Sequence, residues 1–295
     1  GGSPVAPSGF YAGDPLPGTG ERMRVYAQAA PALALTAIED LAAQVELGRI
    51  THLVVASCTG FVAPGIDQIV AARLGLPADV ERLLVGFMGC YAAVAALRSA
   101  RHIVRSEPHA RVLVVTVELC TLHMQADTAP EPLLAQLQFG DGAAAALVTA
   151  DPAGLAIERP FALALPDSAE LIRWDITDRG FVMHLGGAVP GRIGSALNDP
   201  AVVAGLLNGE APEAIDGWAV HAGGRSILDA VEGALGLGAD ALSVSRGVLA
   251  DVGNVSSATL MFVLQRMLAG PRVDKGVALA FGPGLAAEGF GFHHQ

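Results

Sequence analysis

Leu74-Gly-Leu-Pro-Ala-Asp79 recurs later in the chain as Leu235-Gly-Leu-Gly-Ala-Asp240, an offset of 161 residues (235 − 74). Three further pairs of landmarks keep an offset of 163 or 164 residues, namely Cys58 with His221, Cys90 with Asn254, and Arg111 with Lys275. Because these landmarks also occur in the same order, they predict one structural unit that is folded twice and packed about a pseudo-twofold axis.

Segments with helical spacing alternate with short apolar runs along the first half of the chain, and the second half repeats this style. We expect helices over 21–47 (interrupted at Pro31), 64–74 and 91–105, and strands over 52–57, 82–87, 111–118 and 143–150. Such alternation is typical of an α/β fold with helix-covered sheets. Gly and Pro make up half of the first twenty residues, so we expect an irregular arm over 1–20, a first half over 21–152 and a second half over 153–295.

Composition excludes several classes of function. The 295 residues are 52% hydrophobic and only 16% charged, which is enough apolar material for a large core and excludes general disorder. A net charge of −11 disfavours nucleic acid as the main partner. The apolar runs are too short for an integral membrane segment, and no signal-peptide pattern opens the sequence. The first residue is Gly1 rather than Met, which leaves room for a processed leader.

The three cysteines form neither an even disulfide framework nor a C-x-x-C pair. This pattern favours a reduced, cytoplasmic compartment and argues against structural zinc. Cys90 stands out among the three because it ends the apolar strand-like run that starts at Arg82 and opens an alanine-rich helical stretch. A thiol at a helix N-terminus is placed to have a lowered pKa, which favours the nucleophilic thiolate. The alternative interpretation is that Cys90 is a small residue buried in the core, without a chemical role.

A catalytic thiol needs a partner, and eight histidines compete for that role. Position along the predicted elements leaves His123, His184 and His221, of which the first two are also compatible with ordinary core or surface residues. His221 is favoured because it ends a strand and precedes a glycine pair that allows close backbone approach. Asn254, in Gly253-Asn-Val-Ser-Ser257, suits a helix N-cap, and its amide can also donate to a carbonyl oxygen that gains negative charge.

Five short motifs occur together in one order. They are Gly89-Cys90, Phe139-Gly-Asp-Gly142, His221-Ala-Gly-Gly224, Gly253-Asn254-Val-Ser-Ser257 and Phe281-Gly-Pro-Gly284. In this order and spacing the chain resembles the type III polyketide synthases, the chalcone-synthase-like branch of the thiolase superfamily, from about residue 21 to 290. The segments 57–61 and 118–123 look like the bacterial form. The resemblance implies a thiolase-like fold of duplicated βα units, in an α-β-α-β-α layered arrangement with pseudo-twofold symmetry.

The resemblance also implies a homodimer that uses malonyl-CoA and an acyl-CoA starter directly, without a metal or an organic redox cofactor. Carried over, Cys90 is the nucleophile that holds the starter and the growing chain as a thioester. His221 keeps Cys90 as thiolate, and His221 with Asn254 binds the thioester carbonyl during decarboxylation and condensation. Phe139 resembles an aromatic gate between the CoA tunnel and the cavity, and Met183 stands where a second aromatic gate is frequent.

The resemblance further implies substrate-binding roles for Cys58, Cys120, His123, Ser256, Phe281, Gly282 and Pro283. The sequence departs from the family pattern at its start, because the first strand and helix of the first half, and the basic residues that hold the CoA phosphates, are absent from it. We therefore expect a sheet edge without its usual partner. Two alternatives stay open: a ketoacyl-carrier-protein synthase of the initiating type, which shares the Cys, His and Asn, and a non-catalytic thiolase-like partner subunit.

Overall fold

The computed structural model describes residues 6, 9–127 and 129–295. The first half forms a four-stranded sheet with the order β2-β1-β3-β4, in which only β4 is antiparallel to its neighbour. Its strands are β1 (His52–Ser57), β2 (Glu81–Gly86), β3 (Val112–Leu119) and β4 (Asp141–Val148). β1 and β3 are buried along their whole length, as expected for the central strands of a sheet that is covered on both faces.

The second half forms another four-stranded sheet, with the order β5-β10-β9-β8. Its strands are β5 (Leu155–Ala164), β8 (Gly217–Val220), β9 (Gly276–Gly282) and β10 (Ala286–His294). The parallel pair β8 and β9 and the antiparallel pair β9 and β10 repeat the relations of β1, β3 and β4. The expected duplication is therefore present in the topology. β10 pairs with β5 on its outer side, whereas no strand of the described chain pairs with the outer side of its counterpart β4.

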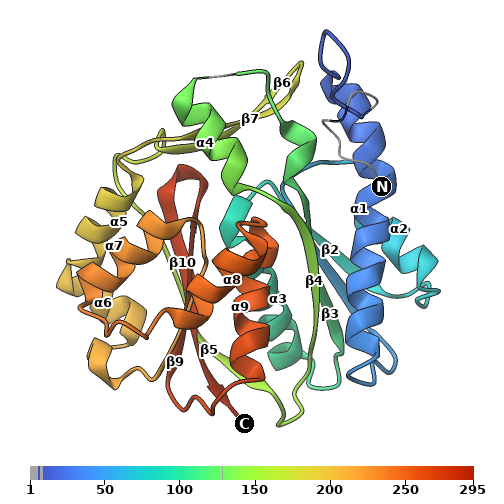
Figure 1. The fold of residues 1–295 in the computed structure, drawn as a ribbon. Coiled ribbons are helices and arrows are strands. Elements are labelled where there is room, and N and C mark those ends of the chain that lie inside the picture. The colour runs from blue at the N-terminus through green and yellow to red at the C-terminus, as the bar shows by residue number, and fades with distance from the viewer. Residues whose placement is uncertain (1–5, 7–8, 128) are drawn as a thin grey trace.

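Helices cover both sheets and fill the space between them (Figure 1). Those of the first half are α1 (Thr19–Ala42), α2 (Ile66–Arg73), α3 (Ala92–Ser106) and α4 (Pro130–Gln138). Those of the second half are α5 (Val189–Leu197), α6 (Pro200–Leu207), α7 (Arg225–Leu235), α8 (Ser243–Val252) and α9 (Ser257–Leu268). α3 and α9 lie between the two sheets, α1 and α2 cover the outer face of the first, and α5 to α7 lie outside the second (Figure 1). The result is the predicted α-β-α-β-α arrangement.

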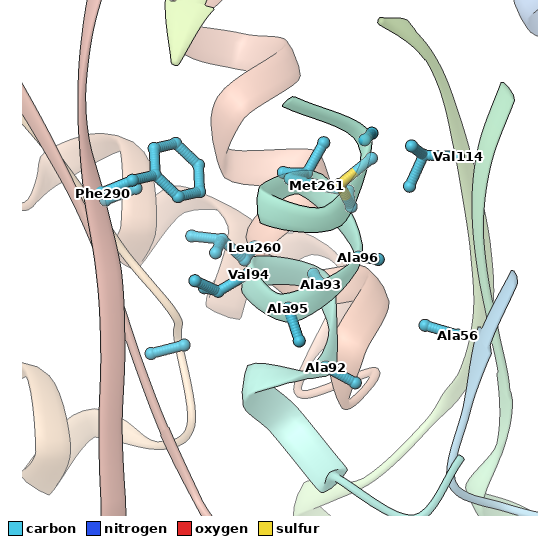
Figure 2. Packing of buried hydrophobic residues seen from close by; sticks show 14 of the residues in the cluster. Ala56, Ala92, Ala93, Val94, Ala95, Ala96, Val114, Leu260, Met261 and Phe290 are labelled. Atoms are coloured by element: carbon cyan, nitrogen blue, oxygen red, sulfur yellow. The ribbon is translucent and has the colours of Figure 1, made fainter. Parts of the chain in front are cut away.

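The two central helices build the core that joins the halves. α3 buries Ala92 to Leu97 without interruption, so it contacts neighbours on all sides, in accord with a helix inside a core. Figure 2 shows its alanines beside Leu260 and Met261 of α9, with Phe290 of β10 and Val114 of β3 on either side. Small side chains on α3 permit this close approach. The packing fixes the N-terminal end of α3, which follows Cys90, relative to the second half.

The first helix differs from the sequence-based expectation. The pattern predicts an interruption at Pro31, but α1 runs through it from Thr19 to Ala42. Pro31 is buried with Tyr26, Ala34 and Ile38 on one stripe that packs against the first sheet. Packing of this stripe outweighs the loss of one backbone hydrogen bond at the proline.

A two-stranded hairpin, β6 (Ile172–Thr177) and β7 (Gly180–Leu185), stands apart from both sheets at the top of Figure 1, close to α4. It turns at Asp178-Arg179-Gly180, where Gly180 has a φ of +92°. No helix in the described part of the chain is both long and apolar enough to cross a membrane.

Candidate active site

Three of the predicted site residues meet where the two halves join. Cys90 lies in a 3₁₀ turn (Gly89–Tyr91) directly before α3, and Asn254 lies three residues before α9, the equivalent helix of the second half. His221 follows the last residue of β8. All three line one cavity of about 310 Å³. The internal repeat therefore places Cys90 and Asn254 at corresponding points of the two halves.

A close approach of two turns puts Cys90 into this cavity. Gly89 has a φ of +63°, and a Cβ atom there would lie 2.4 Å from the Pro283 ring. The Tyr91 hydroxyl donates to the Pro283 carbonyl at 3.3 Å. Only glycine fits position 89 without strain, because both the backbone conformation and the space exclude a side chain. Gly89 is thus needed to pack the turn that carries Cys90 against the Phe281-Gly-Pro-Gly284 turn.

The charge states of Cys90 and His221 differ from the sequence-based prediction. Burial raises the pKa of Cys90 to about 12, an effect that the side-chain hydrogen bonds to Ser256 and Asn254 only partly offset. Burial likewise lowers the pKa of His221 to about 4. The expected lowering of the thiol pKa at a helix N-terminus is therefore outweighed, because removing a thiolate from water costs more than this dipole returns. These shifts favour the neutral thiol and the neutral imidazole at neutral pH.

The His221 ring is unusually free of partners. It is 1% exposed, and neither ring nitrogen has a hydrogen-bond partner among the described residues. A buried imidazole without partners is costly unless a ligand supplies them. The ring borders the cavity, with its Nε2 side close to Gly223, and neither nitrogen is already engaged by a described residue.

Asn254 is held by its own loop. Its Oδ1 accepts from the Ser256 backbone N–H at 2.9 Å, and its Nδ2 donates to the Gly223 carbonyl at 3.2 Å. Ser256, not Asn254, is the N-cap residue of α9, so the predicted cap lies two residues further along the chain. The Gly223 carbonyl uses only one of the two Nδ2–H groups, so the other can be donated to the Cys90 sulfur or to a substrate. The backbone of Asn254 also bonds to Gln138 and Gly140, on either side of Phe139.

Most of the other predicted pocket residues also border this cavity. They are Cys58, Phe139, Met183, Ser256, Phe281, Gly282 and Pro283. The Ser256 hydroxyl lies 3.3 Å from the Cys58 sulfur and 3.8 Å from the Cys90 sulfur. Cys120 and His123 do not border the cavity, which departs from their predicted place on the substrate. Both lie behind the cavity wall, in the 3₁₀ turn Cys120–His123 that follows β3.

Sequence reasoning missed the wall that the β6–β7 hairpin supplies. Ile172, Trp174 and Leu185 line the cavity together with the predicted Met183. Trp174 pairs with Met183 across the hairpin, and Ile172 pairs with Leu185, so all four share one face. The turn signal Asp178-Arg179-Gly180 between two short runs containing β-branched and aromatic residues was available to predict this hairpin.

A buried carboxyl group also escaped the prediction. Glu118 is fully buried at the end of β3, and its oxygens accept hydrogen bonds from the Cys58 backbone N–H at 3.0 Å, Thr59 Oγ1 at 2.9 Å and Ser257 Oγ at 2.5 Å. Burial raises the pKa of Glu118, and these donors act against the rise. The Glu118 carboxyl group thus connects the loop after β1, in the first half, to the start of α9, in the second half.

One group of side chains elsewhere has the composition of a metal site. His52, Glu81 and Glu107 bring one ligand atom each to within 4.8 Å of one another. They lie at the starts of β1 and β2 and at the end of α3, whereas the cavity lies at the opposite ends of these elements. The cavity itself combines thiol, imidazole and amide groups.

Comparison with known proteins agrees with this geometry. Residues 17–152 match the N-terminal domain, and residues 158–294 the C-terminal domain, of the family described as chalcone and stilbene synthases. An alpha-pyrone synthesis polyketide synthase-like protein, Pks18 of Mycobacterium tuberculosis, is 36% identical over 254 residues, which cover 81% of this chain and 64% of that protein. The bisdemethoxycurcumin synthase of Oryza sativa subsp. japonica is 36% identical over 305 residues, covering 94% of this chain and 74% of that one.

A solved structure agrees as well. The 1,3,6,8-tetrahydroxynaphthalene synthase of Streptomyces coelicolor A3(2) superposes with a TM-score of 0.85 at 29% identity, over 95% of this chain and 82% of that chain. The present chain thus spans less than two thirds of the length of Pks18 and about four fifths of this synthase. The two family domains, the two folded halves and the cavity between them show that the chain belongs to the chalcone and stilbene synthase family, the type III polyketide synthases.

Proposed function

We propose that the chain is an acyltransferase that extends an acyl-CoA starter with malonyl-CoA by decarboxylative condensation on Cys90, followed by cyclisation. One observation carries this proposal: Cys90, His221 and Asn254 come from three separate elements of two halves and line one cavity. Thiol, imidazole and amide together supply a nucleophile, a proton acceptor and a hydrogen-bond donor, which are the groups that thioester chemistry requires.

The loading step needs Cys90 and His221 together. Neither charge forms alone at neutral pH, because burial disfavours both. A proton that moves from the Cys90 thiol to His221 creates both charges at once, and each then stabilises the other. The thiolate attacks the carbonyl carbon of the starter thioester, the carbon–sulfur bond to CoA breaks, and the CoA thiolate takes the proton back from His221. The acyl group is then held on Cys90 and both residues are neutral.

The extension step uses the neutral forms. Malonyl-CoA loses carbon dioxide, and the resulting enolate oxygen accepts hydrogen bonds from a ring N–H of His221 and from the free Nδ2–H of Asn254. The enolate carbon attacks the Cys90 thioester, so a carbon–carbon bond forms and the bond to Cys90 breaks. A pKa of about 4 keeps His221 a neutral donor throughout. Neutral donors bind the enolate without also binding the malonyl carboxylate that must leave. Transfer of the longer chain back to Cys90 permits another cycle.

We extend the proposal to the assembly and setting of the protein. β2 is the edge strand of the first sheet, and Leu83 and Leu84 on it are each 42% exposed, with Phe61 and Phe87 exposed nearby. An apolar edge of this kind suits pairing with a second copy of the chain to give a homodimer. Three free cysteines support a cytoplasmic setting. The reaction as written uses CoA thioesters and needs no resident cofactor.

The test is incubation with malonyl-CoA and a panel of aliphatic and aromatic acyl-CoA starters, with products and intact protein analysed by mass spectrometry. We expect an acyl adduct on Cys90 and polyketide products that contain two or more malonyl-derived units. Cys90→Ala abolishes both, because it removes the acyl anchor. Cys120→Ala, the same substitution at a cysteine outside the cavity, is the matched control and keeps both.

Three results would contradict the proposal. Extension with a malonyl carrier protein but not with malonyl-CoA would favour an initiating ketoacyl-carrier-protein synthase. Product formation that survives in Cys90→Ala, or the absence of any adduct and any product in the unmodified protein, would favour a non-catalytic partner subunit or another chemistry.

A further inference from the structure

The end of the first sheet that lies away from the cavity carries a cluster of one imidazole and two carboxylates. His52, Glu81 and Glu107 each bring one ligand atom to within 4.8 Å of the other two. His52 is the first residue of β1, Glu81 is the first residue of β2, and Glu107 is the C-cap of α3. Three elements that are separate in the sequence thus bring these groups to one point, and the proposed reaction uses none of them.

The register of the first sheet explains why His52 and Glu81 are neighbours. The two residues are directly paired in the parallel ladder of β1 and β2, so their side chains lie on the same face. Val54 and Ala56 follow on the His52 face of β1, and both belong to the core cluster around α3. His52 and Glu81 therefore point to the face that α3 covers, at the end of the helix where Glu107 lies.

The imidazole of His52 is buried and is held at one nitrogen. Its side chain is only 7% exposed, and its Nδ1 lies 2.9 Å from Thr51 Oγ1. This hydroxyl accepts from the Arg111 N–H at 2.9 Å and lies 3.2 Å from the Arg111 carbonyl. When the hydroxyl donates to that carbonyl, Nδ1–H donates to the hydroxyl and the lone pair of Nε2 is free. A hydrogen bond at the other ring nitrogen is what orients a metal-binding histidine.

Nε2 of His52 points to the carboxylates. It lies 3.7 Å from Glu81 Oε1, and no described residue forms a hydrogen bond with it. Among the described residues, no arginine or lysine forms an ion pair with Glu81 or Glu107. Arg82, next to Glu81 in the chain, pairs with Asp67 instead, at 3.1 Å. A divalent cation would neutralise the two carboxylates and give Nε2 a partner.

The ligand atoms favour zinc over the alkaline-earth ions. Mg²⁺ and Ca²⁺ take oxygen ligands, whereas one imidazole with two carboxylates suits a first-row ion such as Zn²⁺. Because Zn²⁺ holds nitrogen and oxygen ligands at about 2.0–2.2 Å, two ligands of a tetrahedral ion lie about 3.3–3.6 Å apart. The separation of 3.7 Å between His52 and Glu81 is close to this, and the Glu81 side chain is 73% exposed and free to adjust. The cluster contains no cysteine, so it differs from the zinc sites that the cysteine pattern argues against.

We propose that His52, Glu81 and Glu107 bind a zinc-type divalent cation that ties the end of α3 to the starts of β1 and β2. Water fills the remaining position of the ion. The ion has a structural role, because it lies at the opposite ends of these elements from the cavity. The proposal is therefore independent of the proposed function.

The test is isothermal titration calorimetry of the chelator-treated full chain with zinc chloride, repeated with magnesium chloride. We expect saturable binding of zinc and none of magnesium over the same range. Glu81→Gln and Glu107→Gln should each weaken zinc binding by at least about 100-fold, since even the partners of metal ligands contribute about 10- to 100-fold. Both residues are exposed, so the fold tolerates the change. Glu39→Gln, at an exposed carboxylate of α1, is the matched control and should leave zinc binding unchanged.

Two further measurements address the role of the ion and the orientation of His52. Zinc should raise the midpoint of thermal unfolding of the unmodified protein but not of Glu107→Gln, because an ion that binds the folded state stabilises it. Thr51→Val keeps the volume of the side chain and both carboxylates but removes the hydroxyl at Nδ1. It should weaken zinc binding by about tenfold.

The proposal is overturned if the unmodified protein binds no zinc, if magnesium binds as well as zinc, or if both glutamine variants keep the affinity of the unmodified protein. The cavity thiol is the competing zinc ligand, and Cys90→Ala tests it. Zinc binding that is lost in Cys90→Ala and retained in Glu107→Gln would place the ion in the cavity and overturn the proposal as well.

Discussion

At the scale of single residues, burial decides the chemistry of this site more than sequence position does. Cys90 has the helix-terminal placement that lowers a thiol pKa, but its burial raises the pKa to about 12. His221 is neutral for the same reason. In the proposed loading step the two groups ionise as a pair, so the reactivity of the thiol would depend on the imidazole as well as on the helix.

Asn254 gives a prediction at this scale. Asn254→Ala should lower the rate of malonyl-CoA decarboxylation by about 10²- to 10³-fold, because one of two donors to the enolate oxygen is lost. The free energy of unfolding of Asn254→Ala should fall by only about 1 kcal/mol. This substitution removes the hydrogen bond that the Ser256 N–H donates to Asn254 Oδ1, a loss comparable to that of a helix N-cap. Decarboxylation is measured as release of labelled carbon dioxide. Asn198→Ala, an exposed site after α5, serves as control, and an unchanged rate in Asn254→Ala would refute the assigned role.

At the scale of elements, α3 links the nucleophile to the core. Ala96 is fully buried on this helix, and its methyl group belongs to the cluster that includes Met261 and Leu260 of α9 (Figure 2). The alanine-rich sequence suits a helix packed on all sides, because larger side chains would hold the two sheets apart.

Overpacking this helix should therefore destabilise the protein. We expect Ala96→Leu to lower the free energy of unfolding by about 1–3 kcal/mol, as measured by urea denaturation. The matched control is His102→Leu, which places the same side chain on an exposed position of α3 and should change stability by less than about 0.5 kcal/mol. Equal stability of the two variants would mean that the space between the sheets is not filled as described.

At the scale of the whole molecule, the exposed edge at β2 predicts assembly. The proposed homodimer should sediment with twice the mass of one chain. Leu84→Asp should raise the dimer dissociation constant by about 100-fold, because an unpaired carboxylate in an apolar interface costs several kcal/mol. Val45→Asp, at a residue 41% exposed beyond the end of α1, is the control and should leave the dimer intact. A monomeric unmodified chain, or a Leu84→Asp variant with unchanged affinity, would contradict the proposal.

Much of the fold was predictable because its signals are local or repetitive. The run His52–Ser57 is a buried strand with the predicted ends, and the offset of Cys90 from Asn254 corresponds to equivalent positions before α3 and α9. The break expected at Pro31 was wrong, since propensity at one residue is weaker than the packing of a whole helical face. The β6–β7 hairpin was missed because it has no counterpart in the described part of the first half, so the internal repeat does not point to it.

The amino-acid sequence by itself determined the duplicated α/β architecture and the identity of the thiol, imidazole and amide at the site. These follow from periodicity, spacing and motif chemistry, which the chain carries wherever it folds. Only the tertiary structure decided the charge states of Cys90 and His221, and it also placed His123 behind the cavity wall, bonded to Phe181, instead of in the cavity. Burial and long-range hydrogen bonds depend on which distant segments meet, and a linear sequence does not contain those distances.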